Sequence, residues 1–255
     1  MRLANKVIIV TGSTTGVGEA IARRCVAEGA RVLVHGLERE LGQKAAAELG
    51  AKAALHIDDL ADPASANRIV AAAVEAFGGI DAIVNNAAYI VRSNLQTTDA
   101  ALFDRAMAVN VRAPLLLAQA AMPWLKKAQG CVLSIGSING YCGEANQLAY
   151  SISKGALMTF TRNLADAHGL DKVRFNQLNL GWVRSENEYR LKIKEGFAAD
   201  WPDNPPPAFA PSGKIMSPET IATAAVYWLS DESRPVSGSV LEIEQYPVIG
   251  RNPIK

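Results

Sequence analysis

The sequence contains a tyrosine and a lysine, Tyr150 and Lys154, at a spacing that suits acid–base chemistry. On a helix, side chains four residues apart lie on one face, one turn from each other. A phenol with its ordinary pKa of about 10 is a poor acid or base at neutral pH. An ammonium one turn away stabilises the phenolate, so we expect Lys154 to lower the pKa of Tyr150. The alternative is an ordinary helix that carries the two residues by chance.

Short β-branched apolar runs alternate with longer Ala-rich stretches and predict the elements that position this pair. The expected strands are residues 7–10, 32–34, 53–57, 80–84, 131–135, 172–178 and 240–243. The expected helices are residues 18–28, 40–49, 63–77, 99–127, 150–168 and 218–229. We expect the fourth helix to bend around Pro114 and to end near Pro123. The alternation predicts an α/β fold in which helices cover both faces of a parallel sheet.

One segment, residues 184–216, breaks this alternation because it is rich in proline and charged residues. A long insertion inside a compact domain is usually a lid or a binding loop. We therefore expect this segment to form a lid over the substrate site.

The composition excludes several classes of protein. The chain has 255 residues, which suits one α/β domain over residues 1–255, and a formal net charge of +1 with scattered basic residues. We therefore expect no nucleic-acid or membrane partner. Cys25, Cys131 and Cys142 follow no metal-ligand or disulfide spacing, so each is expected to pack as a small apolar side chain in a reducing compartment. The absence of a signal-like segment adds the expectation of a cytoplasmic protein.

A glycine-rich segment, Thr11–Gly18, joins the first expected strand to the first expected helix. Glycines let the backbone turn tightly and approach a pyrophosphate, and the helix N-terminus supplies unpaired N–H groups and the positive end of the helix dipole. The spacing is GxxxGxG rather than GxGxxG. It favours cofactor binding over a plain glycine-rich turn.

In this order and at this spacing, the motifs are similar to those of the short-chain dehydrogenase/reductase family, over residues 4 to 244. The family's TGxxxGxG is residues 11–18, its Asp after the third strand is Asp59, its NNAG is Asn85-Asn86-Ala87-Ala88, its catalytic Asn is Asn110, its Ser is Ser137 and its YxxxK runs from Tyr150 to Lys154. The resemblance implies a Rossmann-type doubly wound, mainly parallel seven-stranded sheet flanked by helices on both faces.

The resemblance also implies roles for four catalytic residues in an NAD(P)-dependent oxidoreductase acting on a secondary alcohol or carbonyl. Tyr150 would donate a proton in carbonyl reduction or remove one in alcohol oxidation, and Ser137 would hydrogen-bond the developing oxyanion. Lys154 would also bind the nicotinamide ribose, and Asn110 would hold a water that relays protons to it. Taken singly, Ser137 is equally a strand-end hydroxyl that caps its own loop, and Asn110 a polar group that repairs a helix bend.

The same resemblance implies which residues bind the cofactor. They are Gly12, Thr14, Thr15, Gly16, Val17, Gly18, Gly36, Leu37, Arg39, Asp59, Leu60, Asn86, Ala87, Ala88, Tyr150, Lys154, Gly181, Val183 and Ser185. NAD-selective members carry an Asp where this chain has Gly36, and NADP-selective members often carry an Arg where it has Leu37. The missing carboxylate leaves room for a 2′-phosphate that Arg39 could reach, whereas Glu38 could bind the ribose. The balance leans slightly to NADP over NAD.

Three departures from the family pattern stand out. Ala88 places a methyl group where NNAG has glycine. Leu180-Gly181 replaces PG after the sixth strand and leaves that turn less rigid, and Ser185 replaces the Thr that follows. Residues 244–246, Glu-Gln-Tyr, replace DGG, which in the family lies near subunit contacts and the substrate pocket. We therefore expect the subunit contacts and the substrate pocket to differ from those of the family.

The substrate is less well defined by the sequence. Candidate walls of its pocket are Tyr89, Ile90, Asn139, Tyr141, Glu144, Trp182, Tyr189 and Trp201, with Ser137, Asn139, Glu144, Tyr150 and Trp182 as expected contacts. A polar wall from Asn139, Glu144 and Asn187 would suit a hydroxylated or sugar-like substrate. For about half of the aromatic residues we expect plain packing under a loop instead.

We therefore predict an oxidoreductase without a metal site. The resemblance suggests a homotetramer (or homodimer) that packs helices 99–127 and 150–168 across two-fold axes. One alternative is a carbohydrate-active or epimerase-like enzyme that keeps its nucleotide bound. The other is a non-catalytic nucleotide-binding regulatory protein, against which the complete set of catalytic residues argues.

Overall fold

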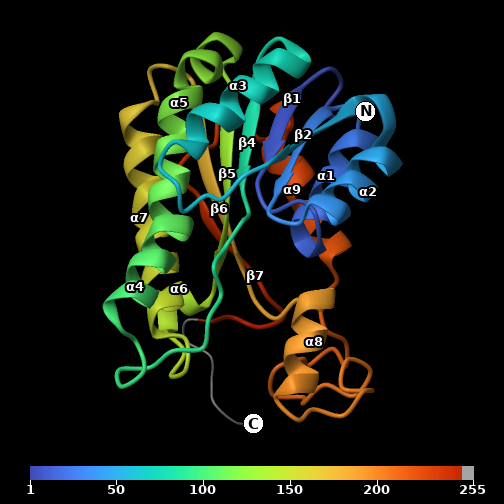
Figure 1. The fold of residues 1–255 in the computed structure, drawn as a ribbon, viewed down its shortest axis with the longest axis vertical. Helices are drawn as coiled ribbons and strands as arrows, with labels where there is room; N and C mark the ends of the chain where they lie inside the picture. Colours follow the sequence, from blue (N-terminus) through green and yellow to red (C-terminus); the bar gives the residue numbers. More distant parts are fainter. Residues whose placement is uncertain (249–255) are drawn as a thin grey trace.

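The computed structural model describes residues 1–248 and contains a seven-stranded sheet in the order β3-β2-β1-β4-β5-β6-β7 (Figure 1). The strands are β1 (Val7–Val10), β2 (Arg31–Gly36), β3 (Ala53–Ile57), β4 (Ala82–Asn85), β5 (Cys131–Ser137), β6 (Arg174–Leu180) and β7 (Val240–Ile243). Every pairing between neighbours is parallel, so the prediction of a mainly parallel sheet is confirmed. The strand order reverses between β1 and β4, and in such sheets the crevice beyond that point binds ligands.

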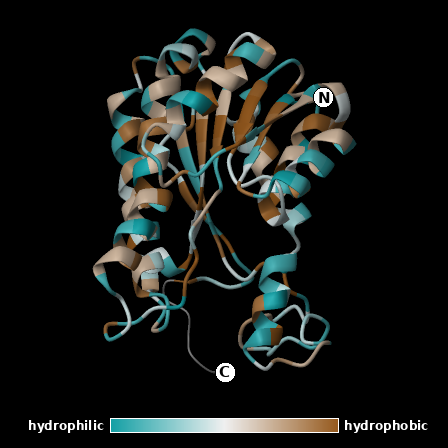
Figure 2. Ribbon diagram, viewed as in Figure 1, coloured by the Kyte–Doolittle hydropathy of each residue, from teal (hydrophilic) through white to brown (hydrophobic). Residues whose placement is uncertain are grey.

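Helices cover both faces of the sheet (Figure 1). They are α1 (Gly16–Ala27), α2 (Arg39–Leu49), α3 (Ser65–Phe77), α4 (Ala100–Met107), α5 (Ala113–Ala128), α6 (Asn139–Cys142), α7 (Leu148–Ala167), α8 (Glu186–Lys194) and α9 (Pro218–Leu229). Side chains of α1 and α9 pack on one face, and those of α3, α5 and α7 pack on the other. Because both faces are covered, β1 is hydrophobic throughout and β4 is hydrophobic up to Asn85 at its end (Figure 2).

Strand β1 shows how the two-residue period of a strand builds two cores. Ile8 and Val10 belong to the cluster under α1 and α9, whereas Ile9 belongs to the cluster under α3, α5 and α7. All three side chains are fully buried. At about 1.5–3 kcal/mol for each buried aliphatic side chain, such strands stabilise the sheet strongly and fix the position of the loops that follow them.

The predicted end of a helix near Pro123 is wrong. The stretch divides instead at a π-helical turn, Ala108–Arg112, and α5 then continues through Pro123 to Ala128. Leu117, Ala121 and Leu125 explain this continuation, because they recur every four residues and are all buried against the sheet. Their packing outweighs the roughly 3 kcal/mol that an interior proline costs a helix.

Two further details differ from the sequence-based expectations. The segment 184–216, expected to form a lid, contains the helix α8 (Glu186–Lys194), which the sequence analysis did not predict. Cys25 and Cys131 are buried as predicted, but Cys142 is exposed, so the expectation that it packs as an apolar side chain is wrong. Within residues 1–248, no helix is long and apolar enough to cross a membrane.

Candidate active site

Three elements bring the predicted catalytic residues together. Ser137 ends β5, Tyr150 and Lys154 lie in the first turns of α7, and Asn110 lies in the π-helical turn against which α7 packs. The Nζ atom of Lys154 lies 5.5 Å from the centre of the Tyr150 ring. It donates a hydrogen bond of 2.7 Å to the carbonyl of Ile135 in β5, which ties the helix to the strand. The tyrosine and the lysine thus share one buried face of α7.

The amide of Asn110 is fully engaged within the protein. Its Oδ1 accepts a hydrogen bond from the backbone N–H of Tyr89 at 2.7 Å, and its Nδ2 donates to the Tyr89 carbonyl at 3.1 Å and to the Ser153 hydroxyl at 2.9 Å. The side chain therefore joins the loop after β4 to α7. A water relay from Asn110 to Lys154 cannot start from the amide hydrogens, because both are used.

The hydroxyl of Ser137 is oriented by its own loop. Its Oγ accepts a hydrogen bond of 3.2 Å from the backbone N–H of Asn139. Because Oγ is the acceptor in this bond, its own hydrogen can be donated elsewhere, either to the Tyr150 phenol, whose pKa the Ser137 hydroxyl lowers, or to a substrate oxygen. The capping alternative for Ser137 and the catalytic one are thus compatible with each other.

Burial controls the protonation of the Tyr150–Lys154 pair. It raises the pKa of Tyr150 to about 12, with the Ser137 hydroxyl acting in the opposite direction and the Glu188 carboxylate raising the pKa further. Burial also lowers the pKa of Lys154 to about 8. The pKa of Tyr150 is therefore raised, opposite in direction to the predicted lowering, because removing the phenolate from water is the largest cause of the shift. At neutral pH the phenol keeps its proton.

The glycine-rich segment forms a cradle at the start of α1. Gly12 and Gly16 have φ values of +62° and +60°, in the region that favours glycine. A Cβ on Gly12 would lie 2.8 Å from the Cα of Ala87, and one on Gly18 would lie 2.2 Å from the Gly12 carbonyl oxygen. Thr15 precedes α1 without a side-chain cap, so the first N–H groups of the helix are left for a ligand. These residues fit a dinucleotide pyrophosphate.

Two polar side chains support this cradle: Thr11, which the sequence analysis named only as part of the motif, and Asn86, which it expected to bind the cofactor. The Thr11 hydroxyl accepts hydrogen bonds from the backbone N–H groups of Asn86 (3.0 Å) and Ala87 (3.1 Å). In return, Asn86 Nδ2 donates to the carbonyls of Thr11 (2.9 Å) and Gly12 (3.0 Å). Asn86 therefore fixes the loop directly and has no N–H left for the ribose.

His35 is a residue that sequence analysis missed. It is buried in β2, and its Nδ1 accepts a hydrogen bond of 3.4 Å from the N–H of Gly12. Burial lowers the pKa of His35 to about 4, so the ring stays neutral and keeps this acceptor at neutral pH. A single polar residue at the end of an apolar run carries no pattern that would have revealed it.

Comparisons with known proteins agree with this geometry. A family model described as enoyl-(acyl carrier protein) reductase matches residues 12–245. Meso-2,3-butanediol dehydrogenase of Serratia marcescens is 30% identical over 252 residues, which cover 96% of this chain and 95% of that protein. The chain belongs to the short-chain dehydrogenase/reductase family.

Two more relatives of this short-chain dehydrogenase/reductase are informative. The crystal structure of a 3-ketoacyl-(acyl-carrier-protein) reductase from Brucella melitensis, complexed with NADH, superimposes with a TM-score of 0.84 at 25% identity and covers 94% of this chain and 97% of that one. A protein named inactive 2-(S)-hydroxypropyl-CoM dehydrogenase 2, from Xanthobacter autotrophicus, is 33% identical over 88% of this chain and 97% of its own length. Apart from this relative, the proteins named here are dehydrogenases or reductases, and the chain is an NAD(P)-dependent oxidoreductase of their family.

At the end of β2, the structure places a carboxylate beside the cradle. A Cβ on Gly36 would lie 2.5 Å from Cγ2 of Thr14, and the Thr14 hydroxyl donates a hydrogen bond of 3.0 Å to Glu38. Leu37 is 55% exposed. Arg39 begins α2 on the surface, and it has no ion pair within the described part of the chain. Of the two candidates for the ribose, Glu38 is the one that the structure ties to the glycine-rich segment.

Asp59, in the segment after β3, is also hydrogen-bonded within the protein. Asp59 accepts hydrogen bonds from the N–H of Ala61 at 2.8 Å and from Arg105 at 3.2 Å, and the Arg105 guanidinium lies 5.5 Å from the centre of the Tyr89 ring. Because Tyr89 is bonded to Asn110, this chain of contacts links Asp59 to the catalytic set.

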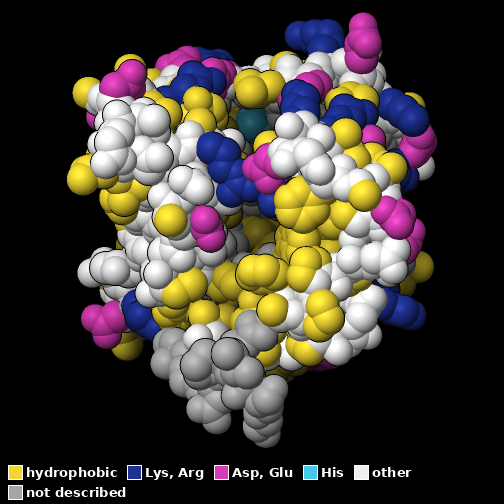
Figure 3. Space-filling view, turned by 90° about the horizontal axis from the view of Figure 1, so that it is seen from below, with side chains coloured by type: hydrophobic (Ala, Val, Ile, Leu, Met, Phe, Trp, Pro, Cys, Tyr) yellow, Lys and Arg dark blue, Asp and Glu magenta, His cyan; other side chains and the backbone are white. Residues whose placement is uncertain are grey.

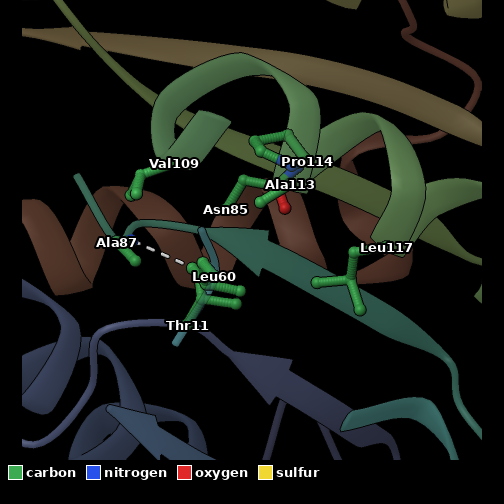
Figure 4. Close-up of a pocket in the computed structure, with 8 residues that line it drawn as sticks. All are labelled: Thr11, Leu60, Asn85, Ala87, Val109, Ala113, Pro114 and Leu117. Atoms are coloured by element: carbon green, nitrogen blue, oxygen red, sulfur yellow. Dashed lines mark hydrogen bonds between the residues drawn. The ribbon is translucent and has the colours of Figure 1, made fainter. Parts of the chain in front are cut away.

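Below this segment lies a small apolar space (Figure 4). Its lining residues are Thr11, Leu60, Asn85, Ala87, Val109, Ala113, Pro114 and Leu117, and it has no room for a water molecule. Asn85 points into it from the end of β4, and neither polar atom of its amide has a hydrogen-bond partner among residues 1–248. Ala88 follows, partly exposed, in the loop towards Tyr89.

The loop after β6 leads from the sheet into residues 184–216, the segment expected to be the lid. The N–H of Gly181 donates to the Ile243 carbonyl at 3.0 Å, and Val183 forms a bridge with Met216 that closes the base of residues 184–216. The Ser185 hydroxyl caps α8 by accepting from the N–H of Glu188. A Cβ on Gly16 would lie 3.5 Å from the Cβ of Ser185, so the lid starts against the cradle.

Most aromatic candidates for the pocket walls pack within the lid. Trp182 stacks on Trp201 with ring centres 5.0 Å apart, Tyr189 also stacks on Trp201 at 6.3 Å, and Phe209 meets Trp182 edge-on at 6.2 Å. The Trp182 indole also donates to Glu188 at 2.8 Å. For these rings the packing alternative describes the structure. Seen from the end at which the lid lies, hydrophobic side chains gather around a hollow (Figure 3).

The three residues of the predicted polar wall have different neighbours. Asn139, beside Ser137, donates through Nδ2 to Oε1 of Gln147 at 3.2 Å. Glu144 is exposed, and Asn187 reaches the Thr15 hydroxyl at 3.5 Å, on the glycine-rich segment. Within residues 1–248 no hydrogen bond joins Asn139 to the other two, and its partner is Gln147, which sequence analysis did not name. Of the remaining candidates, Ile90 is 58% exposed and Tyr141 is partly exposed on α6.

Proposed function

We propose that the protein is an NAD(P)-dependent oxidoreductase that interconverts a secondary alcohol and a carbonyl, with Tyr150 as the proton donor and acceptor. The observation that carries this proposal is the buried cluster of Ser137, Tyr150 and Lys154 at the end of the sheet that also carries the cradle. A bound nicotinamide would supply or accept the hydride. The residues of the chain would hold the nicotinamide and move the proton.

The orientation of each group supports its role. The backbone N–H of Asn139 donates a hydrogen bond to the oxygen of Ser137. The serine hydroxyl can therefore donate its hydrogen to the substrate oxygen as negative charge develops there. Tyr150 is protonated at neutral pH and can give its proton to the same oxygen. Lys154, with a pKa of about 8, can return a proton to the Tyr150 phenolate after the phenol has given its own proton to the substrate. Asn110 holds the loop after β4 against α7, and so it sets the position of that loop relative to Tyr150 and Lys154.

The contact between Thr14 and Glu38 supports NAD as the preferred cofactor. A 2′-phosphate near the end of β2 would meet the Glu38 carboxylate, whereas ribose hydroxyls could donate to it. This contact opposes the lean towards NADP, which was based on the absence of an Asp at Gly36. The exposed Arg39 is the residue that favours NADP.

The amide pair of Asn139 and Gln147 supports a hydroxylated substrate. It lies next to Ser137 and offers donors and acceptors to a second hydroxyl near the reacting carbon. The aromatic lid would cover the apolar side of the same molecule. A diol, a hydroxy ketone or a sugar meets both requirements.

We further propose that residues 1–255 act as one domain in a cytoplasmic homotetramer or homodimer. Leu115 on α5 and Ile152 on α7 support such an assembly, because they are 46% and 44% exposed on the two helices expected to pack across two-fold axes.

The test is a turnover screen with NADH and NADPH side by side, over ketones, diols, sugars and secondary alcohols, read by absorbance of the reduced nicotinamide. We expect turnover with a hydroxylated substrate, and loss of it in Ser137→Ala. The rival function is a non-catalytic nucleotide-binding regulator, which the relative named inactive makes worth testing. Tight nucleotide binding without turnover of any compound would favour the rival.

A further inference from the structure

We propose that Glu244 and Gln245 are positioning residues that hold the turn after β6 and the closing end of the lid against each other. They occupy the place where the family pattern has DGG, and they follow directly on β7. The effects that we expect on kcat and KM rest on the proposed function. The effects on proteolysis of the lid can be measured whether or not that function is correct.

Glu244 holds the turn that begins at Gly181. One of its oxygens accepts from the N–H of Gln245 at 2.7 Å, and the other accepts from the N–H of Trp182 at 3.3 Å. A Cβ on Gly181 would lie only 1.6 Å from this second oxygen, so the carboxylate occupies the space that any other residue would fill. The turn lacks the proline that stiffens it in the family, since Leu180 stands there. The carboxylate supplies that stiffness instead.

Gln245 holds the other end of the lid. Its Oε1 accepts from the hydroxyl of Ser212 at 2.5 Å and from the backbone N–H of Ser212 at 3.2 Å, and its Nε2 donates to the carbonyl of Lys214 at 2.7 Å. Ser212 and Lys214 are exposed, so few other contacts hold this stretch. Two residues further on, Met216 pairs with Val183 at the base of the lid.

The two neighbouring side chains therefore fix both ends of one segment. Glu244 binds the chain where it enters the lid, and Gln245 binds it where it leaves. Between these ends, Trp182 stacks on Trp201, so the position of the turn is transmitted to the middle of the lid. Opening the lid requires the loss of the three hydrogen bonds of Gln245, whereas those of Glu244 can remain.

Limited trypsin digestion of the full-length protein tests the role of Gln245. Removing its three bonds in Gln245→Ala should increase cleavage after Lys214 about fivefold to thirtyfold, because each bond contributes modestly to keeping the lid closed. Gln245→Glu keeps the acceptor for Ser212 and should give an intermediate rate. Gln43→Ala, on the exposed face of α2, is the matched control and should cleave like wild type. Equal cleavage rates in Gln245→Ala and wild type would overturn the proposal.

Kinetics then separate positioning from general stability. Gln245→Ala should raise KM for the substrate about fivefold or more, with the nucleotide Kd and the melting temperature unchanged. Glu244→Gln replaces one acceptor oxygen by an NH₂ group, so it should instead lower kcat about fivefold without faster cleavage at Lys214. A fall in melting temperature that accounts for both changes would overturn the proposal. If no substrate is turned over but cleavage accelerates as expected, the proposed function fails and this proposal stands.

Discussion

The two sides of the site are held in different ways. The cradle of residues 11–18 is partly buried and is hydrogen-bonded to His35 and Asn86, and each of these bonds uses a backbone group. The lid of residues 184–216 is bonded to the rest of the molecule mainly by side chains, among them Gln245 and the ion pair of Arg92 with Glu195. We therefore expect the cradle to be the more rigid of the two regions, and the lid to open at a modest cost in free energy.

This difference has a consequence for how each side tolerates change. Contacts through backbone atoms leave no space for additional side-chain atoms, so substitutions at the cradle act through steric overlap. Contacts through exposed side chains can be lost one at a time, and each contributes about 1 kcal/mol or less. Substitutions of decreasing effect at the cradle, the catalytic pair and the outer rim test this view.

The largest of these effects is expected for Gly18→Ala. The added Cβ would lie 2.2 Å from the Gly12 carbonyl oxygen and 2.4 Å from Nδ2 of Asn86, so the cradle must shift. We expect nucleotide affinity to fall about 100-fold, or about 3 kcal/mol, in a fluorescence titration. Gly79→Ala is the control, because its Cβ would meet only the Trp124 ring at 3.7 Å. A Gly18→Ala variant that binds nucleotide like wild type would show that the cradle is not the nucleotide site.

An intermediate effect is expected for Lys154→Met, and it depends on pH. The folded-state pKa of Lys154, about 8, is below the unfolded value of about 10.5, so the unfolded chain binds more protons and wild-type stability rises with pH through this window. The variant lacks this rise. Urea unfolding at about pH 7 and pH 9.5 should therefore show the difference between variant and wild type shifting by about 2 kcal/mol in favour of wild type at the higher pH. A difference that stays constant would mean that Lys154 is not buried as the structure has it.

The smallest effect is expected for Glu38→Gln, at the exposed rim of the nucleotide side. Removing the carboxylate beside Thr14 should raise affinity for NADPH relative to NADH about fivefold, since charges at exposed sites are screened. The shift should shrink at high salt. Glu40→Gln, at the second residue of α2, provides the comparison. An unchanged ratio in Glu38→Gln would remove this residue from the discrimination between the two nucleotides.

The side expected to be more rigid is also the side that the sequence predicted better. Strands such as Val7–Val10 are buried on both faces, so their composition alone identified them, and the glycine spacing identified the cradle between strand and helix. The face shared by Tyr150 and Lys154 followed from helix geometry. Their burial did not, because it depends on the packing of α7 against β5, and so the direction of the Tyr150 pKa was predicted wrongly.

The lid was predicted as a segment but not as a structure. Its boundaries followed from composition, and the bridge of Val183 with Met216 closes it where expected. Helix α8 was missed because it buries none of its residues fully and therefore shows no clear apolar stripe. The contacts of Gln245 and Gln147 were missed because each joins segments whose proximity only the fold determines.

The central claim is that the phenol of Tyr150 moves the proton while the cradle holds the nucleotide, and single-turnover hydride transfer in Tyr150→Phe tests it most directly. Phenylalanine keeps the ring and its packing, so we expect the nucleotide Kd to stay within about twofold of wild type while the transfer rate falls about 10²- to 10⁴-fold. A variant that transfers hydride at the wild-type rate would contradict the account.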